Sequence, residues 1–149
     1  MTVADTTVRA VEPADAARWR ELFTAYGVFY ETEFGDEVLD SVWEQLLADD
    51  SGIDALVAER DGQVVGIAHY RSHPDTFSGG RDWFLDDLFV DPAARGTGAG
   101  RALIEAIAEL SAGTGGSLRW ITADDNLTAQ ALYEKVATRT RWVMYETRR

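Results

Sequence analysis

The sequence predicts an α/β fold, in which one domain over residues 1–149 has three layers, with helices on both sides of a mixed sheet. The first observation is a hairpin signal: two β-rich runs flank Asp61-Gly62, a pair that favours a two-residue turn between antiparallel strands. The second is that strand-like and helical patterns alternate later in the chain, as in parallel crossover connections. The third is size, because 149 residues, 46% of them apolar, suffice for one substantial core.

Each element follows from its own local signal. Residues 7–11 alternate and predict a strand, after which Pro13 and Asp15 open a helix. A second helix begins at about Asp36, and Asp125 or Asn126 should cap a later one. The other elements expected are a hairpin over 54–71, a polar loop over 72–82, strands at 83–90, 118–124 and 141–146, and helices at 101–111 and 127–136. This order predicts an antiparallel first half of the sheet and parallel strands after it.

The spacing of apolar residues predicts the face that each helix turns to the sheet. These faces are Ala16, Trp19, Leu22, Phe23 and Tyr26 on the first helix, Val38, Val42, Leu46 and Leu47 on the second, and Leu103, Ile107 and Leu110 on the helix at 101–111. All three sets recur at intervals of three or four residues, which is the period of an amphipathic helix.

Composition excludes several kinds of site and partner. The chain has no cysteine and only two histidines, His69 and His73, so we expect no disulfide, no cysteine nucleophile and no metal. A net charge of −12 opposes nucleic acid and favours cationic small molecules or basic peptides, although solubility alone also explains an acidic surface. No run of ~18 apolar residues and no N-terminal signal pattern is present, so we expect no membrane contact and a cytoplasmic location.

The most informative segment is LFVDPAARGTGAGRALIEAIAEL, in which a glycine loop lies between a strand-like and a helical run. The loop comprises Arg95, Gly96, Thr97, Gly98, Ala99, Gly100 and Arg101. It fits neither the dinucleotide fingerprint, since Arg101 stands where the third glycine belongs, nor the P-loop, since no lysine follows. Alternate glycines expose backbone N–H groups at a helix N-terminus, where the helix dipole and the two arginines favour an anion. The pattern therefore predicts a phosphate-binding loop; the alternative is a flexible loop that only caps the helix.

Within LFVDPAARGTGAGRALI, this loop resembles the acyl-CoA motif of the GNAT acetyltransferase superfamily: an arginine or glutamine, two residues, a glycine, one residue, and a glycine or alanine. A second family signature is met in NLTAQALYEK by Asn126, Ala129 and Tyr133. The element order also matches over almost the whole chain, and the ending LYEKVATRT resembles the small bacterial branch related to histone and polyamine acetyltransferases. The resemblance implies the GNAT-like acyl-CoA N-acyltransferase fold, with central parallel strands that splay apart.

The resemblance also implies how acetyl-CoA, the expected co-substrate, would bind. The loop would wrap its pyrophosphate, and its pantetheine arm would pair like an added strand with the strand that ends at Val90. Asn126 would cap the following helix and touch the pantetheine amides. The implied cofactor-binding residues are Leu88, Phe89, Val90, Arg95, Gly96, Thr97, Gly98, Ala99, Gly100, Arg101, Asn126 and Tyr133.

Acetyl transfer to an amine requires a base for the amine, donors for the oxyanion and a proton for the leaving thiolate. Tyr133 is the candidate for the thiolate, since a phenol stays protonated at neutral pH; the alternative is a core tyrosine. Asp86 and Asp87 are the candidate bases, with a hydrogen bond to a neighbouring strand or a helix cap as the alternative. Strand alternation should point them to opposite faces, and we favour Asp86, which would share a face with Leu88 and Val90. The oxyanion donor would be a backbone N–H of this strand.

The acceptor site is expected beside the first helices, where the resemblance places its wall. Tyr30, with Glu31 and Glu33 nearby, would suit a cationic amine, although the aromatic residues there can also belong to the core. His69, in a strand next to Tyr70, is a candidate base or substrate contact, with a structural histidine as the alternative.

The sequence therefore favours an acetyl-CoA-dependent N-acetyltransferase that transfers the acetyl group to a primary amine, small and cationic or on a peptide, by direct attack on the thioester. The alternatives are a non-catalytic acyl-CoA binding or sensing module of the same fold, and a toxin-type acetyltransferase of charged tRNA, which the charge of −12 opposes. Many family members have Gly-Phe after the tyrosine, where this chain has Val136-Ala137 and then one clear strand. The C-terminal sheet edge is then short or is completed by a neighbouring subunit, and we expect a homodimer.

Overall fold

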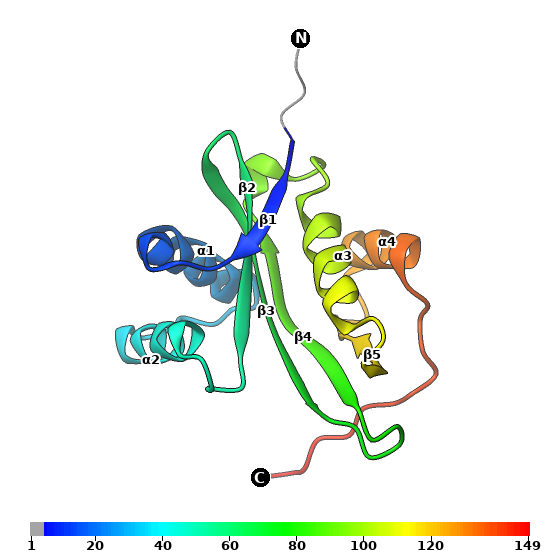
Figure 1. The fold of residues 1–149 in the computed structure, drawn as a ribbon. Helices are drawn as coiled ribbons and strands as arrows, with labels where there is room; N and C mark the ends of the chain where they lie inside the picture. Colours follow the sequence, from blue (N-terminus) through cyan, green and yellow to red (C-terminus); the bar gives the residue numbers. More distant parts are fainter. Residues whose placement is uncertain (1–4) are drawn as a thin grey trace.

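The computed structural model describes residues 5–149, and its elements follow the expected order as far as the last helix (Figure 1). The strands are β1 (Thr7–Ala10), β2 (Asp54–Arg60), β3 (Gln63–Pro74), β4 (Arg81–Val90) and β5 (Gly115–Arg119). The helices are α1 (Ala16–Phe29), α2 (Asp36–Leu47), α3 (Ala99–Ser111) and α4 (Leu127–Val136), with the short 3₁₀ helices η1 (Pro13–Asp15) and η2 (Pro92–Ala94).

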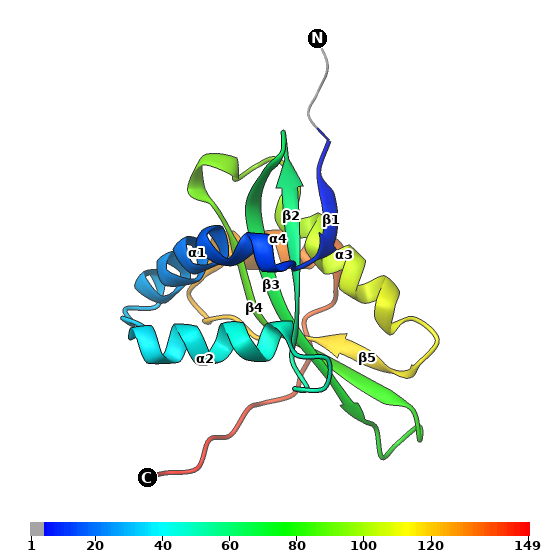
Figure 2. The same cartoon turned by 60° about the vertical axis from the view of Figure 1, so that its left-hand side comes forward.

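The strands form one mixed sheet in the order β1-β2-β3-β4-β5. The pairs from β1 to β4 are antiparallel, whereas β5 runs parallel to β4 after the crossover through α3. Helices α1 and α2 cover one face of the sheet, and α3 and α4 lie on the other (Figures 1 and 2). The predicted three-layer α/β fold, antiparallel first and parallel later, is confirmed.

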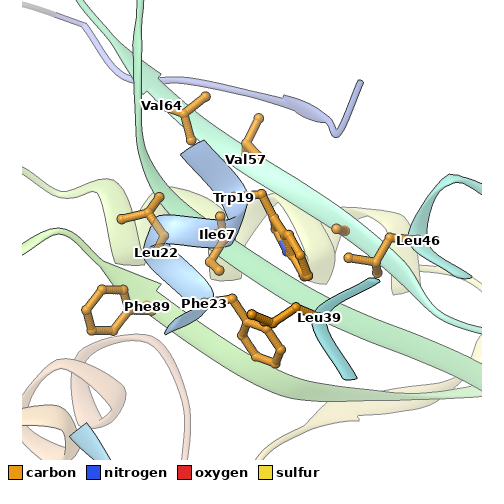
Figure 3. Packing of buried hydrophobic residues seen from close by; sticks show 10 residues of the cluster. Trp19, Leu22, Phe23, Leu39, Leu46, Val57, Val64, Ile67 and Phe89 are labelled. Atoms are coloured by element: carbon orange, nitrogen blue, oxygen red, sulfur yellow. The ribbon is translucent and has the colours of Figure 1, made fainter. Parts of the chain in front are cut away.

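Each face of the sheet has its own apolar cluster, because successive strand residues point to opposite faces. Val57 and Ile67 belong to the cluster under α1 and α2, where Trp19 is buried at its centre (Figure 3). Their neighbours Ala58 and Ala68 belong to the cluster under α3. The small alanines allow α3 to lie close to the sheet, so that the helix is held firmly beside the end of β4.

The β2–β3 hairpin turns at Asp61-Gly62, as predicted. Both residues have positive φ angles, 52° and 75°, which is the type I′ geometry that matches the twist of two antiparallel strands. The turn brings the end of β2 beside the glycine loop, where Arg60 Nη1 lies 3.5 Å from the Thr97 carbonyl oxygen. A third arginine therefore stands near the loop, which the sequence pattern did not indicate.

β4 and β5 are paired at one end and separate towards the other. Their register ends at Phe84 opposite Arg119, whereas β4 continues to Val90. β5 therefore begins and ends earlier than the strand predicted at 118–124, because the chain leaves β4 after Arg119. The predicted splay of the central strands is present, and it leaves the last part of β4 with an open edge.

The paired end is held by close contact and by a carboxylate. A Cβ atom at Gly116 would collide with the Arg81 carbonyl oxygen, so only glycine allows this approach of the strands. The Asp82 carboxylate accepts hydrogen bonds from the Ser117 N–H at 2.8 Å and from Arg119 Nη1 at 2.8 Å. These contacts fix the point from which the two strands diverge.

The buried face of α2 agrees with the prediction at two of four positions. Leu46 is buried and Val42 packs against the same cluster, whereas Val38 is 49% exposed and Leu47 39% exposed. The face also includes Leu39, which is buried, and Trp43, which packs on Trp19 with ring centroids 5.0 Å apart.

Two predicted segments are wrong. The loop expected at 72–82 is shorter, since β3 extends to Pro74 opposite Arg81 and leaves 75–80 as the connection. Polar residues suit this end of β3, where the strand is mostly exposed to solvent. The strand expected at 141–146 does not form: within the described chain, 138–149 has neither helix nor strand, and Trp142 and Tyr145 are 83% and 91% exposed. An alternating segment becomes a strand only beside another strand, and this one runs past the end of the sheet (Figure 1).

No helix among residues 5–149 is long and apolar enough to span a bilayer.

Helix α3 provides a test of the packing. Ile107 is fully buried and Leu103 and Ile104 pack beside it, whereas Leu110, predicted to share this face, is 48% exposed. Ile107→Ala should therefore lower the free energy of unfolding by about 2–5 kcal/mol, while Leu110→Ala should lower it by less than about 1 kcal/mol. Urea unfolding followed by circular dichroism measures both, and equal losses would contradict the packing described.

Candidate active site

A cavity of about 590 Å³ lies between the open end of β4, the glycine loop, α4 and the end of α1. It is lined by Tyr26, Phe29, Tyr30, Leu88, Phe89, Val90, Ala94, Arg95, Gly96, Gly98, Ala99, Gly100, Arg101, Asn126, Thr128, Ala129, Leu132, Tyr133 and Lys135. All the cofactor-binding residues predicted from the sequence are among them, apart from Thr97. The Thr97 hydroxyl instead donates to the Ala94 carbonyl at 2.5 Å and so closes the loop on itself. The fold thus brings two motifs that lie about 30 residues apart to one cavity.

The charge of this lining is opposite to that of the chain. Three cationic side chains, Arg95, Arg101 and Lys135, line the cavity, and no aspartate or glutamate of the described residues does. Lys135 is the only lysine in the sequence, and no motif marked it. In a chain with a net charge of −12, this segregation makes the cavity suitable for an anion.

The glycine loop contributes backbone donors as well as charge. Gly96 and Gly98 have φ angles of 79° and 85°, a left-handed conformation that glycine adopts without strain, and Gly98 is the N-cap of α3. The N–H groups of Ala99, Gly100 and Arg101 have no acceptor among residues 5–149. They lie at the positive end of the α3 dipole, a position that favours an anion.

The opposite wall carries the second motif. Asn126 Oδ1 accepts a hydrogen bond from the Ala129 N–H at 3.3 Å, so Asn126 and not Asp125 caps α4. About two turns after this cap, Tyr133 faces the cavity and packs edge-to-face on Trp120, with ring centroids 5.4 Å apart. Burial, with a contribution from Tyr30, raises the pKa of the Tyr133 phenol, so this group is protonated and can donate at neutral pH.

A β-bulge places the two candidate bases on one face of the sheet. The β3–β4 register pairs His69 with Asp87 but Tyr70 with Leu85, so Asp86 is an extra residue in β4. Asp86 bonds Arg71 at 2.9 Å and Asp87 bonds His69 at 2.9 Å, and these β3 partners are two residues apart. The prediction that the aspartates point to opposite faces is therefore wrong, and Asp86 does not share a face with Leu88 and Val90.

The two aspartates differ in what surrounds them. Asp86 is held in an ion pair with the half-exposed Arg71 guanidinium, away from the cavity. Asp87 lies next to Tyr26, which lines the cavity. Burial of Tyr26, together with the charge of Asp87 and a hydrogen bond to it, raises the pKa of this phenol well above its usual range. Asp87 is thus connected to the cavity through a phenol that stays protonated.

His69 does not reach the cavity. The side chain is fully buried, with Nε2 accepting from the Trp19 Nε1–H at 2.9 Å and Nδ1 facing Asp87 Oδ2 at 2.9 Å. Because both ring nitrogens are engaged inside the protein, the predictions of a base or a substrate contact at His69 are not supported, and the structural alternative holds. Sequence alternation indicated a strand residue but could not show that its partner would be an indole 50 residues away.

The predicted acceptor residues are divided in space. Tyr30 lines the cavity with Tyr26 and Phe29, and the Tyr26 and Tyr30 rings are 4.9 Å apart. Glu31 and Glu33 are exposed and lie outside the cavity lining. Among residues 5–149, no group of three or more His, Asp or Glu side chains is placed to hold a metal ion. The aromatic side chains of Tyr26, Phe29 and Tyr30 form the end of the cavity next to Asp87.

Comparison with known protein families matches residues 18–137 to the acetyltransferase (GNAT) family. The chain belongs to this family. It is 31% identical over 142 residues to the D-amino-acid N-acetyltransferase HPA3 of Saccharomyces cerevisiae, covering 93% of this chain and 88% of the yeast protein. It is 34% identical over 110 residues to aminoglycoside N(6′)-acetyltransferase type 1 of Stenotrophomonas maltophilia, covering 72% of this chain and 68% of that one. The structure of an aminoglycoside N-acetyltransferase in complex with CoA superposes with a TM-score of 0.81, at 21% identity, over 99% of this chain and 97% of that one.

These matches confirm the family, the fold and the enzyme class that the two motifs predicted. The family match spans both the glycine loop and the helix with Asn126 and Tyr133, which the structure brings to opposite walls of the cavity. The protein is an N-acetyltransferase of the GNAT family.

Proposed function

We propose that this GNAT enzyme uses acetyl-CoA to acetylate a primary amine on a small cationic molecule or a peptide. The observation that carries the proposal is the cavity, which combines three cationic side chains, a helix N-terminus and an open strand edge in an otherwise acidic chain. Those features fit a ligand that is anionic at one end and carries amides along its arm, as coenzyme A does. The related structure in complex with CoA supports this assignment.

The residues of the cavity fit acetyl-CoA part by part. The free N–H groups of the α3 N-terminus, with Arg95 and Arg101, would hold the pyrophosphate. The open edge of β4 over 88–90 would pair with the pantetheine amides, and Asn126 would contact them from α4. When bound, acetyl-CoA supplies the acetyl group as an activated thioester.

The remaining groups suit direct attack by an amine. The amine nitrogen bonds to the acetyl carbon, the carbon–sulfur bond breaks, and its electron pair leaves with sulfur. Asp87 accepts the proton that the amine loses, directly or through the Tyr26 hydroxyl, and Tyr133 donates a proton to sulfur. A backbone N–H of β4 stabilises the oxyanion. We assign the role of base to Asp87 rather than to Asp86, because Arg71 already binds the Asp86 carboxylate.

The two aspartates form a matched pair for a test. Asp87→Asn should lower kcat by roughly 100-fold or more, the usual contribution of a general base, with the KM for acetyl-CoA little changed. Asp86→Asn removes the same charge from the same bulge. It breaks only a partly exposed ion pair with Arg71, so kcat should stay within about threefold of the wild-type value. Steady-state kinetics with a good acceptor measure both, and the opposite ranking would return the role of base to Asp86.

The function itself is tested by thiol release. Acetyl-CoA is screened against amino acids of both configurations, polyamines, aminoglycosides and basic peptides, with CoA formation as the signal. An acceptor should be found, and Tyr133→Phe should lower kcat by roughly 100-fold while the Kd for CoA stays the same. CoA binding without thiol release from any amine would favour the acyl-CoA binding or sensing module instead.

Glu31 and Glu33 are proposed to attract a cationic acceptor from outside the cavity, since both are exposed beside Tyr30. The double variant Glu31→Gln, Glu33→Gln should raise the acceptor KM by about two- to fivefold, because exposed charge pairs contribute little each. The difference should shrink at high ionic strength, where surface charges are screened. An unchanged acceptor KM at low salt would remove both residues from the acceptor site.

The proposal includes a homodimer. It is supported by the exposed apolar side chains of the C-terminal segment, among them Trp142, Val143 and Tyr145, which a second copy could cover. Sedimentation velocity should give twice the mass of the chain, and a monomer at micromolar concentration would contradict it.

A further inference from the structure

A buried chain of hydrogen bonds leads from α1 to the proposed base. The Trp19 indole N–H donates to His69 Nε2 at 2.9 Å, and His69 Nδ1 lies 2.9 Å from Asp87 Oδ2. Trp19 and His69 are 1% and 0% exposed, so the bond between them is shielded from water, whereas the Asp87 side chain is 24% exposed. Beyond Asp87 lies Tyr26, on the wall of the cavity. Acetyl transfer as proposed above uses Asp87 and Tyr26 but gives no role to Trp19 or His69.

The indole determines which histidine nitrogen carries the proton. An indole N–H can only donate, so His69 Nε2 must accept and is therefore unprotonated. A neutral imidazole then has its proton on Nδ1, which donates to Asp87 Oδ2. Adding a second proton to His69 would break the bond with Trp19 in a dry environment. Trp19 thereby keeps His69 a neutral donor and prevents it from acting as a base.

The packing keeps the imidazole ring in this orientation. The Phe23 ring meets it edge-on, with centroids 4.8 Å apart, and the Trp19 ring lies 6.0 Å away. A flipped ring would present carbon where Trp19 and Asp87 need nitrogen. One oxygen of the Asp87 carboxylate is thus committed to a fixed partner, which sets the direction of the other.

We propose that Trp19 and His69 are positioning residues for acetyl transfer, which hold one oxygen of Asp87 so that the carboxylate faces Tyr26 and the acceptor amine. The inference rests on the proposed function, because it takes Asp87 as the base. During turnover the proton of the amine passes to Asp87, and His69 keeps its own proton on Nδ1. Neither positioning residue touches either substrate.

The tautomer can be observed without turnover. The chain has two histidines, so ¹⁵N-histidine labelling gives two sets of ring signals, and His73→Gln identifies those of His69. We expect one protonated nitrogen, Nδ1, and one unprotonated nitrogen, Nε2, in the wild-type protein at neutral pH. A proton on Nε2, or on both nitrogens, would overturn the proposal. This result does not depend on acetyl transfer, so it stands apart from success or failure of the proposed function.

Kinetics test whether the arrangement matters for transfer. Trp19→Phe keeps an aromatic ring but removes the N–H, and kcat should fall roughly 10- to 100-fold, the range typical of groups that orient a functional residue. The KM for acetyl-CoA should stay the same, because neither Trp19 nor His69 lines the cavity. Trp43→Phe is the matched control, since this indole packs on Trp19 at 5.0 Å without bonding His69 among the described contacts. Equal kcat in the two variants would overturn the proposal.

A second pair of variants covers the case in which Trp19→Phe does not fold. The His69→Asn amide can still donate to Asp87, so this variant should retain at least fivefold more kcat than His69→Leu, which cannot. Thermal unfolding and CoA binding show whether both are folded. Equal losses in two folded variants would show that His69 only fills space, which overturns its positioning role.

Discussion

The register between β4 and β5 ends at Phe84, and the candidate active site depends on the strand edge that remains beyond it. A sheet edge presents unpaired N–H and C=O groups that can bind an extended ligand. Gly116 and the Asp82 carboxylate hold the two strands together at their start, so the separation begins at a defined point. α4 lies across the opening and contributes Asn126 and Tyr133 to its far wall. Strand pairing that continued to Val90 would fill the place proposed for the pantetheine arm.

The charges around this opening differ from those of the rest of the chain. The chain is strongly acidic, yet the described lining of the cavity has cationic side chains and no carboxylates. The N–H groups at the start of α3 act in the same sense, because the helix dipole adds partial positive charge there. The acidic surface elsewhere would repel coenzyme A but attract an amine, so the two proposed substrates are drawn to different parts of one site.

The bulge in β4 gives the two candidate carboxylates different partners. One extra residue turns Asp86 to the same face as Asp87, where Arg71 binds it, and leaves Asp87 between His69 and Tyr26. A carboxylate that is to act as a base next to the cavity needs partners that fix its orientation but do not occupy the place of the substrate. The buried imidazole supplies such a partner from behind, and the neutral phenol of Tyr26 supplies one at the front.

The sequence by itself determined most of the elements, the hairpin turn, the glycine loop and a helix cap at Asp125 or Asn126. These depend on neighbours within a few residues, and the family could be identified because both of its motifs are local. Tertiary structure decided what depends on distant partners. The face of Asp86, the burial of His69 under Trp19, and the places of Arg60 and Lys135 all follow from contacts between elements. The segment 141–146 shows the same limit, because alternation alone does not make a strand when no neighbouring strand is there to accept its hydrogen bonds.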